Sequence, residues 1–423
     1  MHRPHYKKEC RVSNQPILLA PDQPTSEAPQ PLLSPPLMAT LMAAVFMVSA
    51  EARVIAPLLP AIAQEFRTST SAAGLLITAY SIPYGLFQLV YGPLADRFSR
   101  QRVMGVALGL FALGTLVAWL APSLPALNIV RFCTGAAAAG VIPVALAYVG
   151  DAVPYHERQA TLGRIVSVSS LGGVLSAALG GVIASLLSWR ALFLAYGVVA
   201  LAVAAVLVRL PVVRTRPAGA RVGGGLFGPY LAIFRQARVR AFALYGLVFF
   251  EGIAANGSQG YLGAFLFERD KLSYAAIGAL LTLTGVASML TGRVVGRLVR
   301  RLHEGGMLLA GGAMMTLAYL LVGLRPLLLF FPLAMLLSGA GFVIAHSTLQ
   351  ARATELVPSM RGTAVALFAF ALFLGGGLGT YFAGLAIDAA GYPATLVGTA
   401  AALAIFTAVS WPLLRAGRDS SAS

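Results

Sequence analysis

The chain has 423 residues, of which 58% are hydrophobic and 11% are charged. A soluble domain is nearer one quarter charged, so this composition excludes an ordinary water-soluble protein and indicates that lipid surrounds much of the molecule. The net charge is +16, but the basic residues stand in short clusters between apolar runs. That pattern is typical of polytopic membrane proteins, and we expect no nucleic-acid partner.

Residues 1–36 are polar and rich in proline, and they lack the apolar stretch of a cleavable signal peptide. We predict that they form a disordered cytoplasmic tail. Apolar runs then follow, each long enough to cross a hydrocarbon core of about 30 Å. A single strand cannot satisfy its backbone in lipid, so all of these runs are predicted to be helices. They lie near 37–61, 72–94, 103–121, 125–150, 160–187, 190–210, 240–266, 274–298, 305–324, 327–350, 362–387 and 392–414.

The two halves of the chain look related. The longest connection is basic and glycine-rich, and it follows the sixth predicted helix. A shift of 200 residues places Glu51 on Glu251 and Arg100 on Arg300, which suggests a parallel six-plus-six repeat. We therefore predict an all-α membrane protein with twelve transmembrane helices in two pseudo-symmetric six-helix bundles. The predicted parts are bundles at 37–210 and 240–415, a cytoplasmic linker at 211–239 and a cytoplasmic tail at 416–423.

The orientation follows from the basic residues. Most of them fall in the tail, in the linker and in alternate connections on the same side of the membrane. Positive charge is retained in the cytoplasm, so both termini are predicted to be cytoplasmic. We expect a multi-pass protein of the bacterial inner (cytoplasmic) membrane.

A motif joins the second and third predicted helices. It reads Gly92-Pro-Leu-Ala-Asp96-Arg97-Phe-Ser99-Arg100-Gln-Arg102 and resembles the loop signature of the major facilitator superfamily, with Ser99 where the family usually has glycine. The resemblance implies the MFS fold, and it implies a conformational gating loop made by Gly92, Asp96, Arg97, Arg100 and Arg102.

The resemblance implies that the acid of this motif bridges the two halves when the cytoplasmic side is closed. The free N–H groups at the start of helix 11, near Arg361, attract an anion, so we predict that Asp96 lies against them when the cytoplasmic side is closed. Gly296 stands at the equivalent position of the second half. The mirrored contact should therefore be absent.

A second motif, Leu127-Asn-Ile-Val-Arg131-Phe-Cys-Thr-Gly135, resembles the helix 4 signature of proton-coupled members. An unpaired charge inside an apolar helix is costly, so Arg131 should face a cavity or a partner. The alternative is that Arg131 snorkels to the outer interface.

A third motif is a partial match in helix 5. Its small residues follow the antiporter spacing, but Ser-Ala replaces the family's Gly-Pro pair. Close helix packing in lipid would explain the same residues without an antiporter. The motif consists of Gly163, Gly172, Ser176, Ala177, Gly180 and Gly181.

Four charged residues inside predicted helices are proton-coupling candidates, namely Glu51, Arg53, Arg131 and Glu251. Intramembrane carboxylates are functional candidates by default, and a carboxyl group in a dehydrated cavity can exchange protons near neutral pH. Two structural alternatives stand beside this role. Glu51 could form a static salt bridge with Arg53 or Arg131, and Glu251 could make a structural hydrogen bond to Asn256 or to helix 8.

Other polar residues are candidates for a substrate cavity, although packing or contact with the lipid interface would also explain them. Tyr80, Tyr84 and Gln88 recur at helical spacing on one face of helix 2. The remaining candidates are Asn256, Gln259, Tyr261 and His346. A lone histidine in a helix is more often satisfied structurally than bound to a metal, so no metal site is predicted.

The resemblance covers residues 37–414 and is to the twelve-helix drug/metabolite:proton antiporter group. It implies a secondary active transporter that exports drugs or small metabolites by alternating access, with a cationic or polar substrate displacing the coupled proton. The alternative is a proton-coupled symporter that imports a small metabolite. We expect no enzymatic activity and no cofactor, with the proton-motive force as energy source. The expected partners are a small-molecule substrate, protons and the lipid bilayer, and the protein is expected to be a monomer.

Overall fold

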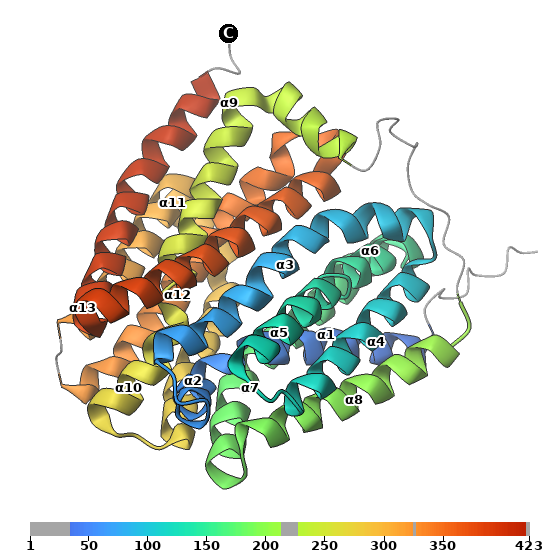
Figure 1. Ribbon diagram of the computed structural model, residues 1–423. Coiled ribbons are helices and arrows are strands. Elements are labelled where there is room, and N and C mark those ends of the chain that lie inside the picture. The colour runs from blue at the N-terminus through green and yellow to red at the C-terminus, as the bar shows by residue number, and fades with distance from the viewer. Residues whose placement is uncertain (1–33, 213–226, 325–326, 420–423) are drawn as a thin grey trace, which may run out of the picture.

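The computed structural model describes residues 34–212, 227–324 and 327–419, with the backbone alone at 96, 155, 411 and 413–419. Nearly all of these residues are helical (Figure 1). The first half contains α1 Pro35–Arg53, α2 Ile55–Glu65, α3 Thr70–Arg97, α4 Arg100–Trp119, α5 Leu124–Ala138, α6 Ile142–Ala152, α7 Tyr155–Leu186 and α8 Trp189–Arg209. The second half contains α9 Gly228–Glu251, the π-helix η1 Gly252–Asn256, the short 3-10 helices η2 Gln259–Tyr261, η3 Leu328–Phe330 and η4 Pro358–Met360, α10 Leu262–Asp270, α11 Tyr274–Gly323, α12 Phe331–Leu356 and α13 Arg361–Asp419.

Ten helical stretches of the described chain are long and apolar enough to cross a membrane. Two of them, α11 and α13, have 50 and 59 residues, about twice the length that one crossing needs. Each contains one residue with non-helical backbone angles, His303 in α11 and Gly391 in α13. Divided at these two kinks, the stretches agree with the twelve predicted crossings.

Prolines interrupt two crossings of the first half. Pro57 lies four residues after Arg53 and Pro143 four residues after Ala139. A proline ring clashes with the carbonyl group four residues earlier and cannot donate to it. The first crossing therefore breaks between α1 and α2, and the fourth breaks between α5 and α6.

The seventh crossing changes its winding instead of meeting a proline. Its regular part, α9, ends at Glu251, and the π-helix η1 follows directly. Such π-helical segments often mark functional sites. The widened turn lets Gly252 and Gly257 lie close against the backbone of α13 at Leu372 and Gly379.

The buried apolar residues form two clusters, one for each half. The first is drawn almost entirely from residues 37–207 and the second from residues 230–406. Tyr261 and Ala383 of the second half belong to the first cluster, so the apolar packing of the first half includes side chains of the second half. Figure 1 shows the blue-to-green half beside the yellow-to-red half.

The halves meet through two antiparallel helix pairs, α3 with α13 and α7 with α11. We call the side with the start of α1 and the end of α13 the termini side, and the opposite side, with the turns at 66–69, 271–273 and 391, the far side. On the far side Gly181 of α7 packs against Tyr274 and Gly278 of α11. On the termini side Gly163, Gly292 and Gly296 have open space where a Cβ atom would stand. Along α7 and α11 the halves are therefore joined on the far side and separate toward the termini side.

Several predicted boundaries need correction. The gating loop is mostly helical, because α3 continues to Arg97 and α4 begins at Arg100, which leaves only Phe98 and Ser99 between them. The predicted linker is helical from Gly228, with non-helical backbone angles at Arg238; its residues 213–226 lie outside the described part. Likewise, α13 extends to Asp419 into the predicted C-terminal tail, and residues 1–33 of the N-terminal tail are outside the described part.

Candidate functional site

A buried ion pair links the first and fourth crossings. Glu51 of α1 and Arg131 of α5 have side chains that are 0% and 1% exposed, and Arg131 Nη1 donates to Glu51 Oε1. The ring of Tyr80 lies 4.2 Å from the guanidinium carbon, within the range of a cation–π interaction. Arg131 therefore does not snorkel, and the partner of Glu51 is Arg131 and not Arg53.

This pair leaves part of its hydrogen-bonding capacity unused. Arg131 Nε and Nη2 and the hydroxyl of Tyr196 are buried and have no hydrogen-bond partner among the described residues. A buried polar atom without a partner costs about 1–3 kcal/mol.

A second acid–base pair links the seventh and tenth crossings. Glu251, at the end of α9, is fully buried, and its Oε2 lies 3.1 Å from Nδ1 of His346 on α12. The histidine ring is 18% exposed and lies between Phe342 and Phe368, with centroid distances of 4.7 and 5.0 Å. The structural alternative for Glu251, a hydrogen bond to Asn256 or to a group of helix 8, is wrong, because its contact is with His346.

The two pairs occupy equivalent places, each joining the first and fourth crossings of its half. They differ in the base. A guanidinium stays charged at any physiological pH, whereas an imidazole gains and loses a proton near neutrality. The acid of the first half is therefore paired with a guanidinium, and the acid of the second half with an imidazole.

Arg53 belongs to neither pair. It lies two residues after Glu51, about 200° around the helix, and its side chain is exposed although it stands within a crossing. Its Cδ and Nε atoms lie beside Gly173 of α7.

The small residues of the helix 5 motif pack in two directions. Gly172, Ser176 and Gly180 face α1 and the α1–α2 break, whereas Gly181 faces α11 of the other half. The hydroxyl of Ser176 donates to the carbonyl oxygen of Ala50. The next turn of α1 is interrupted, so this serine satisfies a carbonyl at the helix end.

Gly163 and Ala177 complete the motif. The backbone of Ala177 lies against Gly278 of α11. At Gly163, by contrast, no atom lies within 4 Å of the point where a Cβ atom would stand. The motif therefore makes contacts on the far side and is open on the termini side.

The gating motif is held by an ion pair within the first half. Arg100 Nε lies 2.6 Å from Asp151 Oδ2, which joins the start of α4 to the end of α6. The second half has the same connection with the charges exchanged, because Arg352 of α12 pairs with Glu304 of α11. Arg97 and Arg102 are exposed. The predicted contact of Asp96 with helix 11 involves a side chain outside the described part.

Gly92 of this motif lies near the other half. A Cβ atom there would stand 3.7 Å from the hydroxyl of Tyr230. That hydroxyl donates to the carbonyl of Leu89 over 2.8 Å, from α9 to α3. This bond is a contact between the halves on the termini side.

The predicted cavity residues separate into two groups. Tyr80, Tyr84 and Gln88 are buried, and Tyr84 lies 4.5 Å from Phe373 of the other half. Tyr261 is also buried, and its hydroxyl donates to the carbonyl of Thr380 over 3.2 Å. These four side chains pack within the protein and do not face an open space. Asn256, Gln259 and His346 are partly exposed.

Sequence reasoning missed a far-side network between the halves. Glu268 Oε1 accepts hydrogen bonds from Thr70 Oγ1 at 2.8 Å and from the hydroxyl of Tyr392 at 2.9 Å. The hydroxyl of Ser71 donates to Asp388 Oδ2 at 2.5 Å. The sequence gives no signal for these contacts, because their members are up to 317 positions apart and carry no motif.

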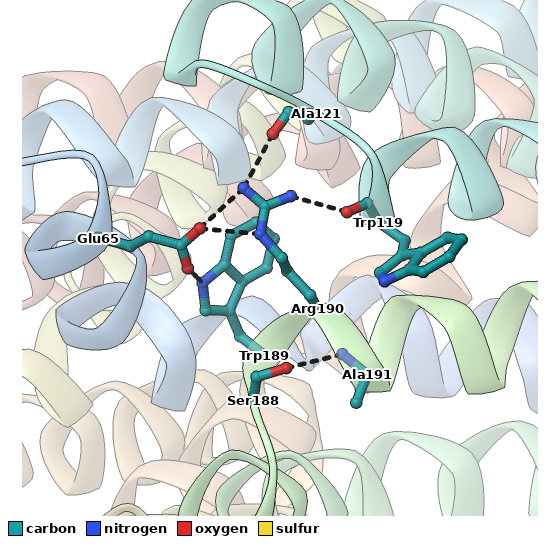
Figure 2. A network of polar contacts seen from close by, with 7 residues as sticks. All are labelled: Glu65, Trp119, Ala121, Ser188, Trp189, Arg190 and Ala191. Atoms are coloured by element: carbon teal, nitrogen blue, oxygen red, sulfur yellow. Dashed lines mark hydrogen bonds and ion pairs between the residues drawn. The ribbon is translucent and has the colours of Figure 1, made fainter.

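A second far-side network lies within the first half (Figure 2). Glu65 of α2 accepts from Trp189 Nε1 at 2.5 Å and from Arg190 Nε at 2.8 Å. Arg190 also donates to the carbonyls of Trp119 and Ala121. This network links α2, α4 and α8 on the far side and includes no described residue of the second half.

The fold and the site define a class. A multi-pass helical protein made of two halves, joined at one side of the membrane and carrying a buried acid–base pair in each half, has the design of a secondary transporter with alternating access. Residues 41–380 match the family model of the Major Facilitator Superfamily. The chain belongs to this superfamily.

Three known proteins illustrate the likeness. The "Uncharacterized MFS-type transporter YceJ" of Bacillus subtilis is 26% identical over 86% of this chain and 92% of its own. The "Lincomycin resistance protein" of Streptomyces lincolnensis is 34% identical over 35% of this chain and 31% of its own. The crystal structure of a bacterial homolog to the human lysosomal transporter Spinster, in an inward-facing and unoccupied conformation, superposes with a TM-score of 0.77 at 18% identity, covering 90% of this chain and 98% of its own.

Proposed function

We propose that this transporter exports small organic molecules across the cytoplasmic membrane in exchange for protons, with the proton-motive force as its energy source. The termini side is then cytoplasmic, as the basic residues indicate, and the structure corresponds to the inward-facing state. The drug-resistance relatives support the direction, since one is a lincomycin resistance protein.

The Glu251–His346 pair carries the proposal. The carboxylate is fully buried, its partner is a histidine, and the π-helix η1 follows it directly. No other titratable side chain of the described residues forms an ion pair or hydrogen bond with this pair. A change of winding in η1 would alter the distance between Glu251 and His346. The protonation of Glu251 and the geometry of the helix that follows it would therefore influence each other.

Exchange proceeds through two protonation states. With the far side open, Glu251 takes a proton and its attraction to His346 weakens. With the termini side open, entry of the substrate favours release of that proton to the cytoplasm. A symporter would use the same groups, but its substrate and proton would move in the same direction.

The test uses inside-out vesicles with an acidic lumen, to which cationic drugs and small organic acids are added one at a time. An exporter gives substrate-dependent proton release from the lumen, and both Glu251→Gln and His346→Gln abolish it. The exposed Glu157 provides the control, because Glu157→Gln removes an acid outside the pair. Unchanged proton release in Glu251→Gln contradicts the proposal, and proton-dependent uptake into whole cells without release in vesicles would establish the symporter.

A further inference from the structure

Arg53 ends an accessible stripe on α1. The members of this stripe follow each other at intervals of three or four residues, which is one face of a helix; they are Ala39, Met42, Phe46, Ser49 and Arg53. Apart from Ala43 beside the stripe and Ala52 next to Arg53, every other residue of α1 from Thr40 onward is buried. The stripe therefore runs from the termini side to the guanidinium of Arg53.

The far side is closed directly beyond Arg53. Gly263 of α10 packs against Ala56 and Pro57 of α2, and a Cβ atom at Gly263 would come within 2.9 Å of the Ala56 carbonyl oxygen. Val54 and Ile55 are buried. Arg53 thus lies where the accessible face of α1 ends.

Arg53 also lies close to the joint between the halves. Its neighbour Gly173 is followed on α7 by Val174, which packs against Gly285 of α11. An arginine exposed to lipid in the middle of a crossing would be costly without a partner. The position beside the α7–α11 joint indicates instead that the guanidinium faces the space between the halves.

No acid among the described residues neutralises this charge. Glu51 is held by Arg131 on the opposite face of α1, and Glu251 is held by His346. Within the described part of the chain, Arg53 forms no ion pair or hydrogen bond. A guanidinium presents five N–H donors in a planar fork that matches carboxylate and phosphate groups.

We propose that Arg53 binds the anionic group of the substrate, and that the protein transports organic anions, carboxylates above all. This inference rests on the proposed function only in taking the α1 stripe as the path of the transported molecule. It assigns Arg53 to substrate binding, whereas the sequence had suggested proton coupling and a cationic or polar substrate.

The test measures charge at the site without requiring transport. Gly173→Cys places a thiol beside Arg53, where a Cβ atom would have only ordinary contacts at 3.5 and 3.6 Å, in a background with Cys10→Ser and Cys133→Ser. Ser49→Cys provides a second reporter on the same stripe. Inside-out vesicles are treated with two methanethiosulfonate reagents, one carrying a sulfonate and the other a quaternary ammonium group.

With Arg53 present, the anionic reagent should label either cysteine faster than the cationic one, and Arg53→Gln should lower the ratio of the two rates several-fold. Arg53→Lys should keep most of the preference. Aromatic and aliphatic carboxylates should slow the labelling when arginine or lysine occupies this position, whereas their amides should not. An unchanged rate ratio in Arg53→Gln, no labelling at either cysteine, or equal protection by the amides would each overturn the proposal.

Inorganic phosphate and chloride separate an organic-anion site from a site for any small anion. If they protect as well as the carboxylates, the site is one for inorganic ions and the proposal fails. Glu251→Gln should leave the rate ratio unchanged, because this ratio reports the charge of Arg53. If Glu251→Gln also leaves proton exchange unchanged, the proposed function fails while the anion site stands.

Discussion

At the scale of single residues, each half of the protein contains one buried acid–base pair. In the first half, Glu51 and Arg131 lie deep in the protein and are closed off by aromatic rings. A buried ion pair contributes little net stability, because desolvation offsets the attraction between the charges. Breaking it is different, since the remaining charge stays buried without a partner.

This asymmetry gives the first prediction. Arg131→Met should destabilise the protein by about 3–5 kcal/mol, because it leaves Glu51 buried and unpaired. The double variant Glu51→Leu with Arg131→Met should recover most of that loss, because no charge remains. Thermal unfolding in detergent, followed by the loss of monodisperse protein, measures both effects. A double variant as unstable as Arg131→Met alone would show that packing around the aromatic rings, and not the ion pair, decides the stability.

At the scale of elements, the pair α7 and α11 shows how the halves can exchange their contacts. The helices are antiparallel, and their contacts Gly181–Gly278 and Val174–Gly285 are seven residues apart on each helix. Eleven residues further along both helices, the same register pairs Gly163 with Gly296. Eleven residues are about three helical turns, so both glycines return to the contact face. In this structure, no atom lies within 4 Å of the point where a Cβ atom of Gly163 or Gly296 would stand.

The register predicts that Gly163 and Gly296 meet when the termini side closes. Cysteines at both positions, in the background without Cys10 and Cys133, should be joined by a short bismaleimide only when the far side is open. Adding substrate under a proton gradient should increase the yield of the cross-link and trap the protein in that state. Gly163→Cys with Gly292→Cys is the matched control, because Gly292 lies about one turn away from the register position. Equal yields for the two pairs would contradict the predicted register.

At the scale of the whole molecule, the sequence predicts the fold well because hydrophobic length is a local property. The twelve crossings, the two halves and their superfamily follow from apolar runs and short motifs. The partners of buried groups do not follow, because they depend on helix rotation. A single sequence places Glu251 in the membrane, but it does not show that His346, on another crossing, turns toward it.

The far-side network was equally beyond prediction. Its members are ordinary polar residues near helix ends, where side chains are usually solvated; they are Thr70, Ser71, Glu268, Asp388 and Tyr392. Only the association of the two halves brings them together. The same association explains why Tyr261 is buried in the first half's cluster instead of lining a cavity.

These far-side hydrogen bonds should set the balance between the two states of the transporter. Glu268→Ala with Asp388→Ala removes the acceptors of three hydrogen bonds, each worth about 1 kcal/mol. Two of them, Thr70–Glu268 and Ser71–Asp388, join the two halves, and Tyr392–Glu268 lies within the second half. We therefore expect the fraction of molecules with an open far side to increase by at least about tenfold relative to the closed fraction. Spin labels at Leu187 and Leu324, exposed far-side positions in different halves, report the separation through their distance distribution.

A control variant and a second measurement on the termini side test this prediction further. Glu355→Ala removes an exposed acid on the termini side and should leave the far-side distances unchanged. If the halves move as rigid bodies, opening the far side must bring α7 and α11 together on the termini side, so the same two alanine substitutions should also raise the Gly163–Gly296 cross-link. Wider far-side distances without a higher cross-link yield would mean that the far-side ends fray locally, and alternating access through these helices would then be wrong for this protein.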